Sequence, residues 1–392
     1  MALSVYVHIP YCLQRCRYCD FTTFEQSEIL PPDEYVRWVL AEIRNRHHLW
    51  ATRQIQTLYF GGGTPSLIDP RLIVAICHEL ANVGFSFKSG AEITLEINPA
   101  TISEAKLNTY LEAGVNRFSV GAQTFNDQLL KDCGRRHTAS DTRETLHLLQ
   151  KYRLNYSFDL LFALPGQSLD VLKNDLAEVE LFHPPHLSAY CLTVPDGHPM
   201  STGRPPEADQ IAMFALIEER LQQMGLLKYE ISNFARPGYE SQHNQTYWSD
   251  QSYWGIGLSS HSYQKEVSPW GRRFWNPKSL KAYAAQVEQS GRDFVEILGD
   301  EQIEQLKAHE ALTDFSHIFL RTTKGLPENA LQYKFPKELS SLLLKRIESL
   351  VGSGLVERSG QFWRLTSQGQ LISNKAFEEL TFLQSDLSFL PH

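Results

Sequence analysis

The first half of the chain alternates between short apolar runs and longer segments with helical spacing. The apolar runs, which we read as β-strands, are Leu3–Ile9, Ile55–Phe60, Glu92–Ile97, Val115–Val120, Tyr156–Phe162 and His186–Val194. The segments with helical spacing are Asp33–Leu49, Arg71–Asn82, Glu104–Ala113, Asp141–Tyr152, Leu169–Phe182 and Asp209–Met224. A strand followed by a helix, repeated about every 30 residues, is typical of parallel βα units. The pattern predicts an α/β fold with a partial (β/α)6 barrel over residues 1–235, and an open doubly wound sheet is the alternative.

Two further parts follow the predicted barrel. Residues 236–295 form an aromatic-rich connecting segment that holds four of the seven tryptophans, and we read residues 240–276 as loops that fill the core or form a flat binding surface. Residues 296–392 contain two segments with helical spacing, 301–320 and 337–350, and then a hairpin pattern over 354–365. A helix followed by a hairpin predicts a winged-helix-like C-terminal domain. Its charges nearly balance, which favours a packing or lid role over DNA binding.

Composition narrows the class of protein. The chain has 392 residues, of which 42% are hydrophobic and 21% charged, as expected for a globular protein of two or three domains. Its net charge of -8 does not provide the basic surface that general nucleic-acid binding needs. We expect no integral membrane segment, because no run of 18 apolar residues occurs. The first ten residues lack the features of a signal peptide, which favours the cytoplasm; whether the chain forms a homodimer stays open.

Three cysteines, Cys12, Cys16 and Cys19, directly follow the first predicted strand. Three thiolates on one loop can hold three corners of a [4Fe–4S] cluster, and the fourth iron then stays open to a small molecule. A zinc site with His8 as its fourth donor is the alternative. The remaining cysteines are expected to be buried small hydrophobic residues: Cys77, Cys133 and Cys191.

Polar and glycine residues mark the ends of the predicted strands. Gly61–Ser66, with the sequence Gly-Gly-Gly-Thr-Pro-Ser, follows the second strand. It matches neither a dinucleotide fingerprint nor a P-loop, and without the cysteines a tight βα turn is the preferred interpretation. Glu96, Gln123, Arg135 and Asp159 lie at or near the ends of the next three strands. In a βα barrel these positions converge on the mouth, where ligands bind.

The cysteine spacing after a first barrel strand resembles the radical S-adenosylmethionine (SAM) superfamily. In that superfamily SAM chelates the open iron, and an electron from the cluster cleaves it. The similarity extends to the oxygen-independent coproporphyrinogen III oxidase family through Tyr6–Cys12, Gly61–Ser66, Glu92–Pro99, Arg117–Phe125, Asp159–Gln167 and Tyr229–Asn233. The resemblance implies that one SAM contacts Tyr6, Tyr18, Gly62 and Glu96. The resemblance also implies a second set of SAM contacts, at positions that bind another SAM in the oxidase: Gly63, Thr64, Gln123, Arg135 and Asp159.

Two departures indicate a branch of that family. Phe21 stands where the oxidases have a further cysteine, and 11 residues precede Cys12, where the oxidases have a long segment that covers the substrate. Residues 243–248 resemble the His-Asn-x-x-Tyr-Trp motif of the HemW-type haem chaperones. That branch binds haem and transfers it to acceptor proteins, and it is described as retaining the cluster and SAM sites.

The motif has a physical rationale for haem, because imidazole is a common axial ligand of haem iron. His243 is then the candidate ligand, His261 is a second candidate, and Tyr247 and Trp248 could pack against the macrocycle. Three arginines are candidates for the propionates: Arg236, Arg272 and Arg273. The alternative is that His243 caps a turn while the aromatic residues fill the open side of the barrel.

We therefore expect a cytoplasmic haem chaperone with a [4Fe–4S] cluster, SAM and haem as cofactors and haem-accepting proteins as partners. An active oxidase, or a related radical enzyme acting on a tetrapyrrole, is the alternative, and a zinc-bearing interaction protein is the third hypothesis. Whether the chain is an enzyme stays open.

Overall fold

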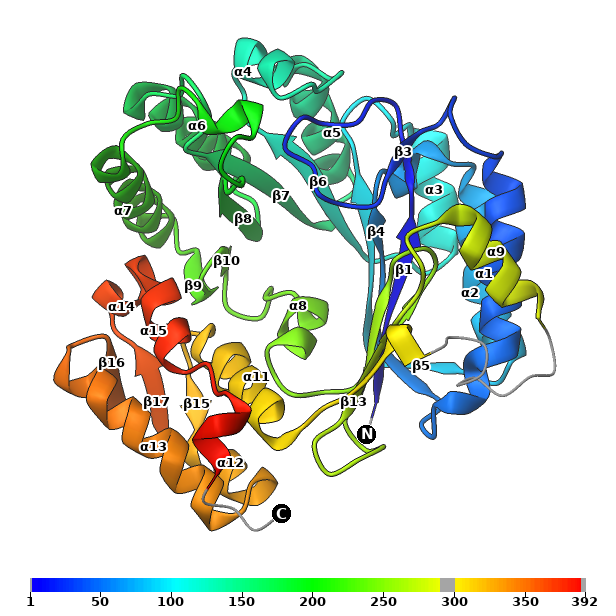
Figure 1. The fold of residues 1–392 in the computed structure, drawn as a ribbon. Coiled ribbons are helices and arrows are strands. Elements are labelled where there is room, and N and C mark those ends of the chain that lie inside the picture. The colour runs from blue at the N-terminus through cyan, green and yellow to red at the C-terminus, as the bar shows by residue number, and fades with distance from the viewer. Residues whose placement is uncertain (1, 290–299, 389–392) are drawn as a thin grey trace.

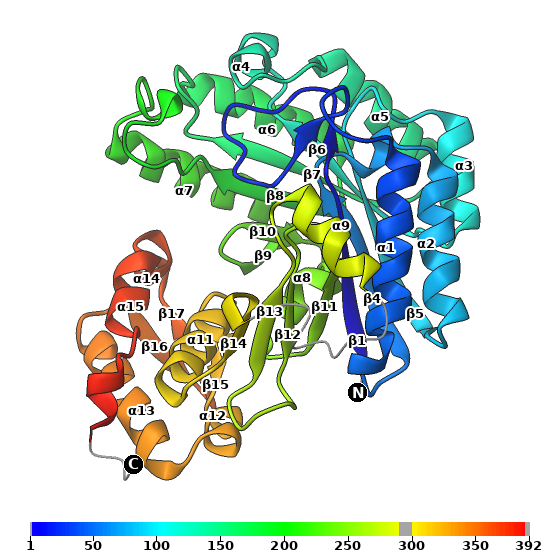
Figure 2. The same ribbon diagram turned by 45° about the vertical axis from the view of Figure 1, so that its right-hand side comes forward.

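Six parallel strands form the centre of the computed structural model, which describes residues 2–289 and 300–388. The strands lie side by side in chain order: β1 (Leu3–Ile9), β4 (Gln54–Gly62), β5 (Ser86–Ile97), β6 (Arg117–Gln123), β7 (Asn155–Phe162) and β8 (His186–Cys191). Helices cover the outer face of this curved sheet (Figures 1 and 2): α1 (Pro32–Arg46), α2 (Pro70–Asn82), α3 (Glu104–Glu112), α5 (Ala139–Lys151), α6 (Leu169–Phe182) and α7 (Glu207–Gln223). In the part of the chain that the structure describes, the sheet runs from β14 to β9 without closing. The predicted partial βα barrel is confirmed.

Short strands extend the sheet at both edges. At one edge β11 (Tyr253–Ile256) pairs in parallel with β1, and three antiparallel strands follow: β12 (His261–Gln264), β13 (Arg272–Trp275) and β14 (Ile303–Gln305). At the other edge are β10 (Asn233–Ala235) and β9 (Leu227–Glu230). The reading of residues 240–276 as loops was therefore wrong for the strands β11, β12 and β13 and for the short helix α8 (Gln242–Tyr247). Strands of four residues are too short to show a clear alternating pattern, and their pairing is decided by distant partners.

The remaining elements of this part lie in its connections. They are β2 (Tyr11–Cys12), β3 (Phe24–Glu25), α4 (Asp127–Asp132), α8 (Gln242–Tyr247) and α9 (Leu280–Glu288). Helix α8 contacts β4 and lies on the inner side of the curved sheet (Figure 1). The segment that contains the His-Asn-x-x-Tyr-Trp motif is thus placed inside the barrel half.

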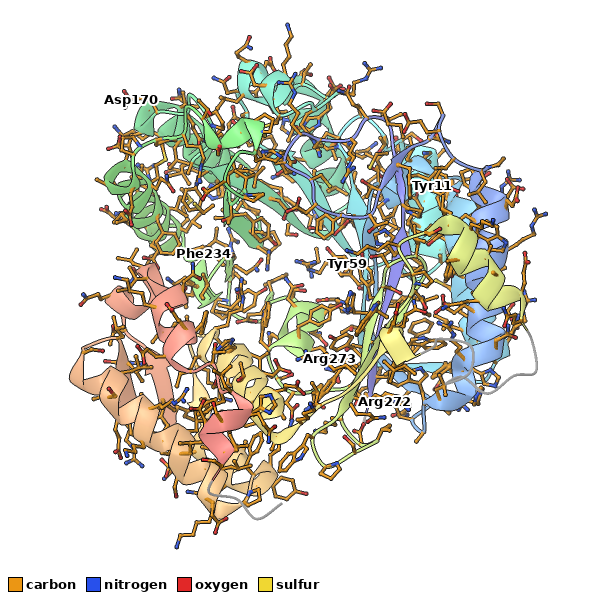
Figure 3. All side chains as sticks on the ribbon, viewed as in Figure 1. Tyr11, Tyr59, Asp170, Phe234, Arg272 and Arg273 are labelled. Carbon is orange, nitrogen blue, oxygen red and sulfur yellow. The ribbon has the colours of Figure 1, made fainter. Side chains whose placement is uncertain are left out.

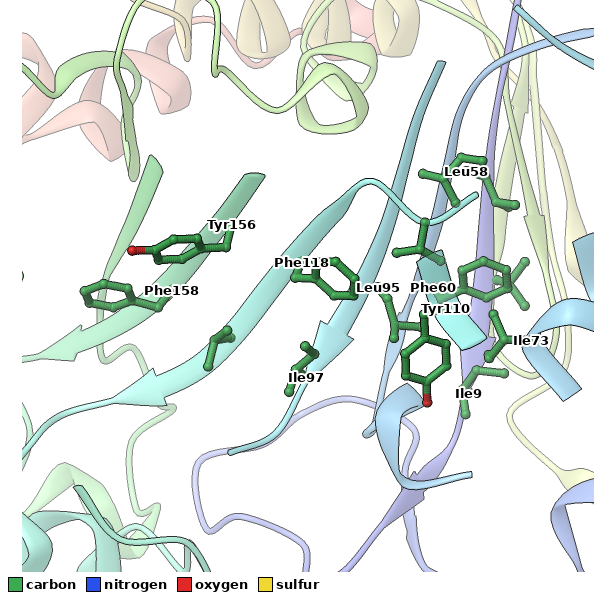
Figure 4. Close-up of a cluster of buried hydrophobic side chains, with 14 of the residues drawn as sticks. Ile9, Leu58, Phe60, Ile73, Leu95, Ile97, Tyr110, Phe118, Tyr156 and Phe158 are labelled. Atoms are coloured by element: carbon green, nitrogen blue, oxygen red, sulfur yellow. The ribbon is translucent and has the colours of Figure 1, made fainter. Parts of the chain in front are cut away.

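The two faces of the central strands differ in chemistry, because successive side chains of a strand point to opposite sides. The outward side chains are apolar and pack against the helices, as Figure 4 shows for Leu58 and Phe60 of β4, Ile73 of α2 and Tyr110 of α3. The inward side chains are largely polar: Ser4, Tyr6, His8, Thr57, Tyr59, Glu92, Thr94, Glu96, Arg117, Ser119, Gln123, Ser157, Asp159, His186 and Ser188. Parallel strands buried on both faces usually carry apolar residues on both. The polar inner face therefore marks the concave side as a site for polar ligands.

The C-terminal part has its own hydrophobic core, around Leu312, Phe315, Leu343, Ile347 and Trp363. Its elements are α11 (Ala308–Leu320), β15 (Leu326–Pro327), α12 (Glu328–Lys334), α13 (Lys337–Gly352), β16 (Val356–Ser359), β17 (Phe362–Leu365), α14 (Ser367–Leu371) and α15 (Ser373–Glu379). The predicted helix followed by a hairpin is present, whereas residues 300–305 form a short 3-10 turn and β14 instead of the start of a helix.

The division of the chain at residues 235 and 295 stays a prediction, and the boundary at 295 lies outside the described residues. Within the described ranges, no helix combines the length and the apolar character needed to cross a bilayer.

Candidate functional site

The three loop cysteines lie at the carboxyl end of the first strands. Cys12 ends β2, Cys16 and Cys19 follow in the next loop, and all three are partly accessible. Burial raises the pKa of the Cys12 thiol to about 11, although hydrogen bonds with Thr23 and Thr64 lower it. The thiol is thus protonated without a metal, and a metal would displace its proton on binding.

The other cysteines differ among themselves. Cys77 and Cys133 are buried, as expected, but Cys191 is exposed at the end of β8. The expectation was wrong for Cys191, which ends β8 and stays exposed although its Sγ lies 3.8 Å from Gln210 Oε1 of α7.

One pocket brings nearly all the predicted cluster and SAM residues together. Eleven of them line it: Cys12, Cys16, Tyr18, Cys19, Gly62, Gly63, Thr64, Glu96, Gln123, Arg135 and Asp159. Phe21, at the position of the additional cysteine of the oxidases, lies at the same pocket and is 64% exposed. The residues come from five strands (β2, β4, β5, β6 and β7) and three loops, so the convergence at the barrel mouth is realised.

The glycine segment places a backbone donor beside Glu96. Gly62 has a φ of +113°, in the region that favours glycine, and its N–H donates to Glu96 Oε2 at 3.1 Å. A Cβ at Gly63 would lie 2.6 Å from the carbonyl oxygen of Tyr11. Tyr59 donates from its phenol to the other oxygen of Glu96 at 2.8 Å. Burial raises the pKa of Glu96 to about 7, so the carboxyl group titrates near neutral pH.

Arg135 connects the cysteine loop to the strand ends. Its guanidinium donates to Cys16 Sγ at 3.5 Å, to Asn98 Oδ1 at 3.1 Å and to the Gly121 carbonyl oxygen at 2.6 Å. Burial raises the pKa of Asp159 to about 6, and the charge of Arg135 is among the factors that lower it. A cation and two carboxyl groups that titrate between pH 6 and 7 thus face one pocket.

Three of the seven non-glycine residues with positive φ in the described ranges lie at the same end of the sheet. Ala100, Gln123 and Ala163 have φ values of 66°, 67° and 60°, and they lie at or just after the ends of β5, β6 and β7. A non-glycine residue in the left-handed region costs about 1–3 kcal/mol and is concentrated at functional sites. The strain therefore supports a binding role for this edge.

Tyr6 and His8 lie on β1 and do not line the cysteine pocket. The Tyr6 phenol lies 3.1 Å from His8 Nδ1, and His8 Nε2 lies 2.8 Å from the Thr22 carbonyl oxygen. Both nitrogens of His8 are thus engaged, so it is not a free fourth donor for zinc. Among the residues described, no group of three or more His, Cys, Asp or Glu side chains is arranged to hold a metal ion. The ligands of a [4Fe–4S] cluster bind separate irons and need not converge on one point, so the three loop cysteines fit a cluster.

His243 lies in α8, is 2% exposed and has both ring nitrogens engaged. Its Nδ1 lies 2.8 Å from Thr57 Oγ1, and its Nε2 lies 3.0 Å from the Tyr247 hydroxyl group. The ring also stacks on Tyr59, with centroids 4.9 Å apart. Burial lowers the pKa of His243 to about 3, so the imidazole is neutral. His243 is therefore linked through Tyr59 to Glu96 of the cysteine pocket.

The other haem candidates lie apart from α8. His261 begins β12 and stacks on Trp275, with centroids 5.6 Å apart. Arg272 and Arg273 lie on β13 (Figure 3); Arg272 donates to Gln264, and Arg273 forms ion pairs with Glu304 and Asp314. Arg236 donates to the carbonyl oxygen of His183. These arginines thus already have partners.

Sequence reasoning missed Tyr59, Asn98 and Ser119, which contact or line the site. The sequence contained a signal for two of them, because Tyr59 and Ser119 occupy those alternate positions of their strands that carry polar residues. The strands were read as apolar runs, and the alternation within them was not used.

Comparison with known proteins gives consistent results. A family model described as "Radical SAM superfamily" matches residues 6–179, and one described as "HemN C-terminal domain" matches residues 308–372. "Heme chaperone HemW" of Bacillus subtilis (strain 168) is 33% identical over 95% of this chain and 98% of the relative. The protein of the same name from Escherichia coli (strain K12) is 31% identical over 96% of this chain and 97% of its own. The structure of coproporphyrinogen III oxidase (HemN) from Escherichia coli aligns with this one with a TM-score of 0.81, over 99% of this chain and 91% of that chain. The two sequences are 22% identical, and the two proteins have the same fold.

Proposed function

This chain belongs to the HemW family of radical SAM proteins, and from that premise we propose that it is a cytoplasmic haem chaperone that transfers haem to acceptor proteins. The observation that carries the proposal is the similarity, over nearly the whole chain, to relatives named heme chaperones. The partners are haem and haem-accepting proteins, and a homodimer stays an open prediction.

The cysteine pocket is the proposed site of the cluster and SAM. Cys12, Cys16 and Cys19 would hold a [4Fe–4S] cluster, because their thiols lie on one accessible loop beside Arg135. The residues proposed for one SAM are Tyr6, Tyr18, Gly62 and Glu96, of which Tyr6 lies on β1 outside the pocket lining. Those proposed for a second are Gly63, Thr64, Gln123, Arg135 and Asp159. Cluster and SAM together supply one-electron chemistry when they are bound. The carboxyl groups at the strand ends would accept hydrogen bonds from SAM, and Arg135 would pair with its carboxylate.

The α8 segment is the proposed haem-binding element. Ligation of iron by His243 would require its hydrogen bonds with Thr57 and Tyr247 to be exchanged, since both nitrogens are engaged. His243 is also 2% exposed, so ligation would require a rearrangement that gives the iron access to its ring.

The experiment is a haem titration and a coproporphyrinogen assay on one sample, reconstituted anaerobically with iron and sulfide. We expect stoichiometric haem binding and no formation of protoporphyrinogen. The variant His243→Ala should change the haem spectrum or lower the occupancy, and His261→Ala serves as the matched control.

Turnover of coproporphyrinogen, with SAM cleaved in proportion to product, would replace the chaperone by the oxidase. A haem spectrum that is unchanged in His243→Ala would remove only the ligand role of that residue. If His261→Ala alone changes the spectrum, the ligand role moves to His261.

A further inference from the structure

A second large cavity lies where the barrel half meets the C-terminal part. Its volume is about 680 Å³, and its walls include Tyr229 and Trp248 from the barrel side and Phe319, Lys324 and Phe362 from the C-terminal side. Pockets for small molecules and cofactors typically measure about 300–1,000 Å³. The cavity thus has the size of a ligand site.

Four aromatic side chains from four separate segments of the chain line this cavity. Tyr229 belongs to β9, Trp248 follows α8, Phe319 belongs to α11 and Phe362 to β17, and all four are partly accessible. Aromatic walls favour a flat apolar ligand, because rings stack face to face with an offset or edge to face. The cavity is therefore suited to a planar macrocycle.

The Trp248 wall is held by Arg321, which is partly accessible and forms an ion pair with a buried carboxylate. The Arg321 guanidinium lies 4.5 Å from the centre of the Trp248 ring, and Arg321 Nε donates to Glu230 Oε2 at 2.7 Å. Glu230 is fully buried, which makes this pair costly to break. The wall is thus formed before any ligand arrives, and ordering it adds no further cost to binding.

The cavity carries a cation at its edge. Lys324 is exposed, and its ammonium lies 5.2 Å from the centre of the Phe362 ring. Within residues 2–289 and 300–388, no salt bridge joins Lys324 to a carboxylate. Glu240 also lines the cavity, but its carboxylate accepts the Gly238 N–H at 2.9 Å. Lys324 is therefore available to a ligand carboxylate.

Another cavity, at the base of the barrel, has a different lining. It measures about 430 Å³ and is lined by Ala2 and polar side chains, among them Gln54, Gln56, Gln242 and Gln251, with no aromatic residue among those described. The amide-rich lining does not suit a flat apolar ligand. The aromatic cavity, which Trp248 lines five residues after His243, does.

We propose that the cavity between Trp248 and Phe362 holds the haem macrocycle, with a propionate at Lys324. This inference rests on the proposed function and gives its cargo a location. The site lies between two parts of the chain and opens to solvent, so an acceptor protein could reach the haem there. His243 lies in α8, the helix that Trp248 directly follows.

The test titrates the full-length, reconstituted protein with haemin and with metal-free protoporphyrin IX. The metal-free probe reports the macrocycle contacts, since it has no iron to ligate. Trp248→Ala, Phe362→Ala and Lys324→Glu should each weaken binding of both probes by about tenfold or more, whereas Lys324→Arg should bind as the wild type does. Two exposed positions of the C-terminal part serve as controls that keep full affinity: Tyr333→Ala and Lys345→Glu.

Circular dichroism and cluster loading show whether each variant folds, and Lys324→Glu alters only an exposed side chain. If the wild type binds neither probe, the proposed function fails and this inference fails with it. If the wild type binds both probes and the three cavity variants bind as tightly, the cavity assignment is overturned while the chaperone function stands.

Discussion

Replacing Tyr59 with phenylalanine removes one hydroxyl group beside the proposed SAM site, and we expect the pH dependence of SAM binding to move upward. Tyr59 donates to Glu96 at 2.8 Å, and Gly62 N–H donates to the other carboxyl oxygen at 3.1 Å. Burial raises the pKa of Glu96 to about 7, and both hydrogen bonds lower it. Loss of the phenol donor destabilises the ionised carboxylate, so the pKa of Glu96 rises further.

The size of the shift follows from the hydrogen bond that is lost. A hydrogen bond to a charged group contributes about 1.5–3 kcal/mol, and one pKa unit corresponds to about 1.4 kcal/mol. The pKa of Glu96 should therefore rise by roughly one to two units. At pH 7 the ionised fraction would fall from about one half to about one tenth or less. SAM affinity that depends on this carboxylate would then fall about fivefold or more at pH 7 and recover at higher pH.

The assay is calorimetric titration of SAM into anaerobically reconstituted protein over a range of pH. In the wild type, affinity should rise with pH through about 7 as Glu96 ionises, and in Tyr59→Phe the midpoint should lie higher. Tyr156→Phe is the matched control, because its phenol donates to the Phe182 carbonyl oxygen, away from the pocket. The reasoning is refuted if Tyr59→Phe and the wild type share one midpoint.

Three further outcomes are expected. A triple variant in which alanine replaces all three loop cysteines should lose iron and sulfide loading, whereas Cys77→Ala should keep it. If the triple variant holds as much iron and sulfide as the wild type, the cluster assignment is excluded. Arg135→Gln should weaken SAM binding by roughly ten- to a hundredfold, the equivalent of one charge-assisted hydrogen bond, and an unchanged calorimetric affinity would remove Arg135 from the site. Glu42→Ala should lower the free energy of unfolding by about 3–5 kcal/mol, because the buried Arg46 loses its carboxylate partner at 2.8 Å. Urea unfolding measures this, and a midpoint equal to that of the wild type would contradict it.

Local sequence patterns were enough to predict the six βα units. The helix predicted over Leu169–Phe182 has these same bounds in α6, where Ser168 caps the first turn through Val171 N–H. The strands predicted from apolar runs also formed, because hydrophobic periodicity and turn residues act over a few positions. The cysteine spacing and the glycine turn are likewise local, so the candidate cluster loop and the Gly62 position could be named from the sequence.

Only the tertiary structure decided which distant segments meet. β11 pairs with β1 in a register that joins Ser4 to Tyr253, and His243 reaches Thr57 and Tyr59 on β4. No local pattern specifies such contacts, because they depend on the curvature of the whole sheet and on where α8 packs against its inner face. The sequence by itself thus determined the elements and the chemistry at the strand ends. The link from His243 through Tyr59 to Glu96, and the aromatic cavity at Trp248, arise from packing between residues far apart in the chain.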